Sequence, residues 1–170
     1  MNQVQVYKKN TPTIHEQIVV AYTYYCNSDD RKSLERLRDE AEEGNPWAAV
    51  WLAESYIRGI TNDREDDIKK AMRWLDKCGD FPLAQFKLAE LYLEEEKTQK
   101  KGKKLLKLAA EAGLVDAHFS LGTHYSSGTI FKANDTKAKS HLKKAREYGH
   151  PEAHKELKRL KKKQAGGDKI

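Results

Sequence analysis

The stretch Ala117–Tyr125, with the sequence A-H-F-S-L-G-T-H-Y, decides the fold because its frame recurs along the chain. The frame consists of an alanine, a leucine four residues later and a tyrosine eight residues later. Complete copies begin at Ala48, Ala84 and Ala117. Residues spaced by three or four lie on one face of a helix, so each copy predicts a helix with one apolar face. A frame that recurs in tandem predicts a repeat protein.

A second helix is expected after each of these helices, and it carries a leucine at a fixed place. These leucines, with one from an earlier and weaker unit, are Leu37, Leu75, Leu106 and Leu142. Alanine allows two helices to cross closely, while leucine and tyrosine fill the space between hairpins. One hairpin cannot bury its apolar face alone, so several must stack. The sequence therefore predicts an all-α fold, a solenoid of stacked antiparallel helical hairpins.

One solenoid domain is predicted over residues 13–160, with about three full repeats and a half-unit at each end. Residues 13–26 and 33–43 have the pattern of two helices and form the first, weaker hairpin. Residues 1–12 are expected to be a polar lead-in, and residues 161–170 a basic flexible tail. A chain of 170 residues is long enough to bury a core of its own.

The composition indicates a folded, very polar protein. Charged residues make up 34% of the chain and the mean hydropathy is −0.87, yet its Trp, Tyr and Phe residues supply apolar groups that disordered chains lack. No stretch approaches the roughly 20 apolar residues of a membrane helix, and the first ten residues lack the apolar core of a secretory signal. Cys26 and Cys78 differ in repeat position, unlike a disulfide framework. We therefore expect a cytoplasmic protein without a membrane span.

The repeated pattern resembles the Sel-one-like repeats, which are relatives of tetratricopeptide repeats. Their unit of about 36 residues reads A-x-x-x-L-G-x-x-Y-x-x-G, a loop, then D-x-x-K-A-x-x-W-L-x-x-A-A-x-x-G. Residues 117–128 match the first half at every marked position, and residues 67–75 match the second half equally well. Other units depart from the pattern, with Ala53 and Ala89 at the first-helix glycine and Gly102 where alanine is usual.

The resemblance implies a right-handed α-α superhelix whose first helices line a concave surface. It also implies a function, because members are mostly adaptors that bring proteins together, often in bacterial signalling, secretion and envelope processes. A cysteine-rich branch of the family has been linked to β-lactam binding, but its regular cysteine pair in each repeat is missing here. A β-lactam hydrolase is therefore an alternative for which the chain supplies no nucleophile and base.

No catalytic, cofactor-binding or metal-binding residue is predicted, and we expect no enzyme activity. The sequence has no P-loop, G-x-S-x-G, H-E-x-x-H or Rossmann glycine pattern. The acidic run 63–67 lacks the alternate-residue acids of a calcium loop. His150 and His154 have no third ligand nearby, so we interpret the histidines as surface residues. Cys78 stands where two other units have alanine, which indicates a small buried residue rather than a nucleophile.

A partner-binding surface is predicted where first-helix residues vary between units, because residues that stack the repeats should not vary. The candidates are Trp47, Trp51, Glu54, Ile57, Arg58, Leu83, Glu90 and Leu93. A concave surface with Trp, Ile and Leu, edged by Glu and Arg, suits an extended peptide or a partner's helix. Capping or packing between repeats is the alternative for each residue. The leading hypothesis is a non-enzymatic scaffold, adaptor or inhibitor that binds a protein.

Two lysine-rich blocks support a second hypothesis, a helical repeat protein associated with nucleic acid. Residues 97–107 contain six lysines and no acid, and residues 155–163 contain six basic residues and one acid. Such blocks attract nucleic acid or acidic proteins. The candidate contacts are Lys100, Lys101, Lys103, Lys104, Lys158 and Arg159. Alternatively the blocks are solvated helix faces, and the sequence lacks a basic groove interleaved with aromatic residues.

Overall fold

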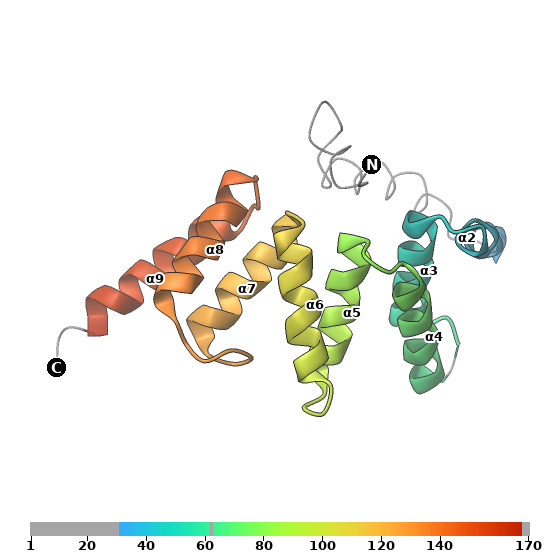
Figure 1. The fold of residues 1–170 in the computed structure, drawn as a ribbon, viewed down its shortest axis with the longest axis horizontal. Coiled ribbons are helices and arrows are strands. Elements are labelled where there is room, and N and C mark those ends of the chain that lie inside the picture. Colours follow the sequence, from blue (N-terminus) through green and yellow to red (C-terminus); the bar gives the residue numbers. More distant parts are fainter. Residues whose placement is uncertain (1–30, 62, 168–170) are drawn as a thin grey trace. The chain divides into compact units, whose positions relative to one another are not determined.

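The computed structural model describes residues 31–61 and 63–167, and all regular structure in these residues is helical (Figure 1). The helices are α2 (Arg31–Glu42), α3 (Pro46–Arg58), α4 (Arg64–Lys77), α5 (Pro82–Glu94), α6 (Gln99–Glu111), α7 (Val115–Ser127), α8 (Asp135–Glu147) and α9 (Ala153–Gly167). The chain divides into two compact units, Met1–Trp74 and Leu75–Ile170. The predicted lead-in 1–12 and helix 13–26 lie outside the described residues.

Neighbouring helices pair as antiparallel hairpins, which confirms the predicted all-α fold. In the second unit α5 packs against α6 and α7 against α8, and the hairpins are joined by contacts of α6 with α7 and of α8 with α9 (Figure 1). In the first unit α2 packs against α3. In the part of the chain that the structure describes, no helix is both long and apolar enough to cross a membrane.

The ends of the helices follow from local sequence. Asn45 is the N-cap of α3, and its side chain accepts hydrogen bonds from the backbone N–H groups of Trp47 and Ala48 at 3.0 and 3.4 Å. The fixed φ of Pro46 then suits the first turn. These bonds satisfy two N–H groups that a helix start leaves without a partner.

The link from α6 to α7 is a glycine cap. Gly113 has a φ of 91°, a left-handed conformation that residues with a Cβ rarely adopt. Its N–H donates to the carbonyl of Ala110 at 2.9 Å, and the N–H of Leu114 donates to that of Ala109 at 3.0 Å. This pair of bonds is the Schellman motif, and Leu114, which donates the second bond, is buried. The short link holds α7 directly beside α6.

The residues of the repeated frame form the core. The frame alanines and leucines are buried in every unit: Ala48, Ala84, Ala117, Ala153, Leu52, Leu88, Leu121 and Leu157. The second-helix leucines are buried as well: Leu37, Leu75, Leu106 and Leu142. Of the three frame tyrosines, Tyr56 and Tyr125 are buried and Tyr92 is half-buried. The frame therefore explains the stacking of the helices.

A comparison of Gly122 in α7 with Gly102 in α6 explains how the third unit departs from the family pattern. A methyl group on Gly122 of α7 would lie 2.6 Å from Leu142 Cγ in α8. A methyl group on Gly102 of α6 would lie 3.0 Å from the carbonyl oxygen of Ala89 in α5. The hairpin α5–α6 thus has its smallest residue on the second helix instead of the first. Exchanging alanine and glycine between the helices preserves their close crossing.

The C-terminal region differs from the prediction. Residues 161–167 continue α9, although a flexible tail was expected from residue 161. The segment begins with three lysines, Gln164 and Ala165, which favour helix, and the helix ends at two glycines, which do not. Lys163 Nζ also donates a hydrogen bond to the carbonyl of Ser126 in α7 at 2.9 Å. The last turns of α9 are therefore attached to the second unit.

Candidate functional site

The residues of α3 outside the repeat core form one line along the helix. Trp47, Trp51, Glu54 and Arg58 are spaced by four, three and four residues, which places them on one side of α3. None of the four is buried, in contrast to the frame residues of the same helix. Arg58 Nε lies 3.8 Å from Glu54 Oε1; the Arg58 side chain is exposed and that of Glu54 is half-buried. We call these four residues the α3 line, which has an aromatic end and a charged end.

The remaining candidates take different positions. Ile57 is half-buried beside the α3 line, and its carbonyl accepts a hydrogen bond from the Arg64 guanidinium. On α5, Glu90 is exposed and pairs with Lys87 at 3.6 Å. Leu93 is half-buried. The role of these residues in binding stays a prediction.

Leu83 departs from the expected surface position. Only 5% of it is exposed, so it offers a partner almost no surface. Leu83 follows Pro82 in the first turn of α5, where removing its apolar side chain from water is favourable. The candidate partner-binding residues on α5 are therefore reduced to Glu90 and Leu93.

The lysine candidates lie on two helices of the second unit. Lys103 and Lys104 follow Lys100 by three and four residues, so all three lysines lie on one face of α6. Lys101 points elsewhere, because its Nζ lies 5.6 Å from the ring centre of Tyr92. On α9, Lys158 and Arg159 are exposed.

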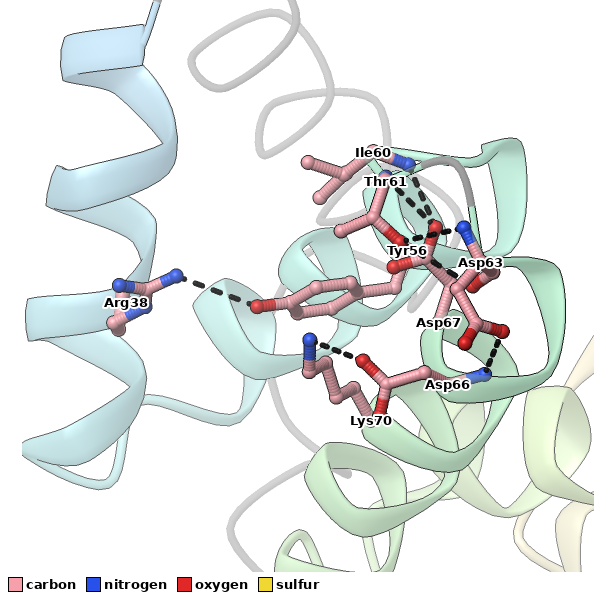
Figure 2. Close-up of polar contacts among 8 residues, drawn as sticks. All are labelled: Arg38, Tyr56, Ile60, Thr61, Asp63, Asp66, Asp67 and Lys70. Carbon is pink, nitrogen blue, oxygen red and sulfur yellow. Dashed lines mark hydrogen bonds and ion pairs between the residues drawn. The ribbon is translucent and has the colours of Figure 1, made fainter.

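A cluster of hydrogen bonds around Asp67 stabilises the loop between α3 and α4. Figure 2 shows the carboxylate of Asp67 facing the backbone amides of Ile60 and Thr61, which donate to Oδ2 at 3.0 and 2.9 Å. Asp67 is fully buried. Burial would raise its pKa, but the hydrogen bonds from Thr61 and Ile60 and the charge of Lys70 outweigh burial and hold the pKa below its usual value. The ionised carboxylate thus holds the loop closed.

A second set of contacts in Figure 2 surrounds the frame tyrosine of α3. The Arg38 guanidinium donates to the Tyr56 hydroxyl at 3.3 Å, which joins α2 to α3. Lys70 Nζ lies 5.7 Å from the Tyr56 ring centre and 2.5 Å from Asp66 Oδ2. These groups hold helices together, so we interpret this cluster as structural rather than catalytic.

We predict that Asp67→Asn lowers the thermal unfolding midpoint by several degrees, whereas Asp76→Asn, exposed on the same helix, leaves it unchanged. In the Asp67→Asn variant, the side-chain NH2 group would lie either against the two backbone N–H donors or on the side where Oδ1 now lies. Oδ1 is buried without a partner among the described residues, so the NH2 group would lack an acceptor in either orientation. Because the folded pKa is lowered, the stabilisation is present above the unfolded pKa of about 3.9 and is lost as the pH falls through the folded value. Equal midpoints for the two variants would contradict this role.

Two histidines join α7 to α8. His118 Nδ1 lies 3.0 Å from His141 Nδ1, so one ring donates and the other accepts when both are neutral. Burial, together with the charges of His141 and Lys144, lowers the pKa of His118 to about 4. Burial also lowers the pKa of His141, with Lys144 and Lys137 adding to the effect. The pair is therefore neutral at pH 7.

The prediction of surface histidines is wrong for His118, which is only 5% exposed. Its ring lies against that of His141 on α8, with 5.3 Å between ring centres. His150 is also partly covered, since its ring stacks on Phe119 at 3.9 Å. His154 is exposed, as expected.

The described residues offer little for catalysis or metal binding. They include no group of three or more His, Cys, Asp or Glu side chains arranged to hold a metal ion. Burial raises the pKa of the Cys78 thiol to about 11, so it is protonated at neutral pH and a poor nucleophile. Cys78 is half-buried, so it is less enclosed than the small buried residue that the sequence predicts.

Two features of the second unit were missed by the sequence reasoning. One is the histidine pair, and the other is the position of Lys103 and Lys107, whose Nζ atoms lie 5.8 and 5.5 Å from the ring centre of Phe131. Both depend on which side chains meet across neighbouring helices. The only available signal was the spacing of Lys107 from Lys103 and Lys100, which continues one face of the helix.

These observations define the class, an all-α repeat protein built from stacked helical hairpins. The Sel1 repeat family model matches the chain in three tandem copies, at residues 48–77, 82–114 and 115–150. The copies cover more than half of the chain, and the protein belongs to the Sel1 repeat family. The resemblance to Sel-one-like repeats is thereby confirmed.

Two solved structures of Sel1 repeat or SLR fold proteins are similar to this chain. A Sel1 repeat protein from Oxalobacter formigenes is 27% identical with a TM-score of 0.60, over 75% of this chain and 98% of that one. The antigen c5321 of uropathogenic Escherichia coli strains, which has an SLR fold, is 27% identical with a TM-score of 0.66, over 82% of this chain. The match spans 31% of the c5321 chain. No match was found among the curated proteins. The fold is therefore an all-α repeat solenoid.

Proposed function

We propose that this chain is a non-enzymatic adaptor or inhibitor in the bacterial cytoplasm that binds a protein or peptide through its first helices. Sel1 repeat proteins generally act as scaffolds for protein–protein interactions, which supports the class of partner. The observation that carries the proposal is the α3 line, with two tryptophans at helix positions outside the repeated frame.

The same line has a different character in each repeat. On α7 the four equivalent positions hold Asp116, Ser120, Thr123 and Ser127, which are small or polar. Exposure of part of a tryptophan side chain to water is energetically unfavourable, and tryptophan is enriched among the residues that dominate binding energy. A line that is aromatic in one repeat and polar in another gives a partner one preferred position and direction. The Glu54–Arg58 pair at the charged end then adds specificity more than affinity.

Affinity capture from the native host with the wild-type protein, followed by mass spectrometry, tests the proposal. We expect a stoichiometric protein complex that is lost or much weakened by Trp47→Ala and by Trp51→Ala. Truncating a dominant contact costs about 2 kcal/mol or more, which is about a 30-fold loss of affinity.

Tyr148→Ala is the matched control, because Tyr148 is a 60% exposed aromatic residue at the end of α8. It should retain the partner. Capture at wild-type levels by both tryptophan variants would rule out the α3 line as the binding site.

A further inference from the structure

The second unit carries a large excess of positive charge, and little of it is ion-paired within residues 31–61 and 63–167. Between Lys97 and Lys163 the chain has eighteen Lys and Arg residues against six Asp and Glu. In the part of the chain that the structure describes, Arg159, which pairs with Glu156 at 3.4 Å, is the only one of the eighteen in an ion pair. The first unit is different, because opposite charges there pair along the helices, as in Lys69 with Glu65.

The excess is concentrated on one face of α6. Lys100, Lys103, Lys104 and Lys107 follow the i, i+3, i+4, i+7 spacing of a single helix face. They line a shallow depression together with Leu108 and Glu111. Leu108 is 37% exposed, so an apolar contact lies among the charges. We call the four lysines and Leu108 the α6 face.

Neighbouring aromatic rings hold part of this face in place without cancelling its charge. The Nζ atoms of Lys103 and Lys107 lie over Phe131, in the loop between α7 and α8. Phe131 packs in turn on Tyr125, with 4.8 Å between ring centres. A ring face attracts an ammonium group but carries no net charge. Phe131 therefore helps to position part of the α6 face, which carries four lysines beside the single acid Glu111.

We propose that the α6 face is a docking surface for an acidic protein segment, one that presents Glu or Asp at helical spacing with an apolar residue among them. This inference rests on the proposed protein-binding function and adds a second surface to it. Complementary charge makes the encounter faster and more selective.

The composition of the face favours a protein over nucleic acid. It contains no arginine, the side chain best suited to bidentate contacts with phosphates and bases. Its aromatic ring, Phe131, is half-buried beneath two lysines instead of being open for base stacking. Leu108 offers an apolar contact that a phosphate backbone would not use. A second copy of the chain is disfavoured, because the net charge of +6 makes copies repel one another.

Fluorescence anisotropy with a labelled acidic peptide tests the inference on the full chain. The probe is a helical peptide with Glu at the i, i+3, i+4 and i+7 positions and one Leu among them. We expect it to bind wild-type protein at low salt, with affinity that falls as salt is added. Lys100→Glu with Lys104→Glu should weaken binding by at least about tenfold.

The matched control is Lys139→Glu with Lys143→Glu, two exposed positions on α8 with the same change in net charge. It should retain affinity within about threefold, since it alters the overall field but not the α6 face. Circular dichroism of each variant checks that the fold is unchanged.

Three results would overturn the inference. Equal losses in the two double variants would show a nonspecific effect of net charge. Tighter binding of an oligothymidylate that depends on Lys100 and Lys104 would assign the face to nucleic acid. Dimers of wild-type protein that disappear in the α6 variant would assign it to a second copy. The peptide assay does not involve the α3 line, so failure of that site would leave this result unchanged.

Discussion

Replacing Leu106 with alanine is expected to lower the free energy of unfolding by about 2–5 kcal/mol, as for other large-to-small changes in protein cores. Leu106 is fully buried at the second-helix leucine position that recurs in each unit of the repeat frame. The change removes apolar contacts and leaves a cavity that the close helix crossings around it prevent from collapsing. Urea unfolding followed by circular dichroism measures the loss.

Leu108→Ala on the same helix is the matched control. Leu108 is 37% exposed, so its truncation should change the unfolding free energy by less than about 0.5 kcal/mol. A small and equal effect of the two substitutions would contradict the assignment of the leucine frame to the core.

Acidification from pH 7 to pH 4 is expected to destabilise the protein partly through His118. The folded pKa of about 4 lies below the unfolded value of 6.5, so the unfolded chain binds more protons between these limits. The contribution of His118 to stability is therefore greatest above pH 6.5 and is lost as the pH decreases towards 4. The shift corresponds to at most about 3 kcal/mol from this residue.

His118→Gln should flatten the dependence of unfolding free energy on pH between 6.5 and 4. Asp67 and other carboxylates lose their stabilisation at lower pH in both proteins, so the difference between the two curves isolates the histidine. His154→Gln, at an exposed position on α9, serves as the control. A slope identical to wild type in the His118 variant would show that the pair does not govern this part of the pH dependence.

The fold could be predicted because its determinants repeat. Ala117 and Leu121 have counterparts at the same spacing in neighbouring units, and every one of these counterparts is buried. Periodicity averages over units, so one irregular unit does not hide the signal. Even the exchange between Ala89 and Gly102 was visible as a departure from the family pattern, although its reason required the geometry of the helix crossing.

The polar contacts between helices could not be predicted because each depends on a single pair of side chains. His118 and His141 are 23 residues apart, and they meet only because α7 and α8 cross in one register. Lys107 and Phe131 likewise meet across two repeats. No periodic signal marks such pairs. For the same reason the burial of Leu83 was missed, since variation between units alone does not distinguish an open position from a packed one.

The central claim is that frame residues stack the repeats while the α3 line binds a partner. The most direct test measures two quantities on Trp51→Ala, the affinity for the captured partner and the free energy of unfolding. We predict an affinity about 30-fold weaker, with a loss of stability well below that of Leu106→Ala. A loss of stability as large as that of Leu106→Ala, with unchanged affinity of the folded protein, would show that Trp51 packs the repeats and would contradict the claim.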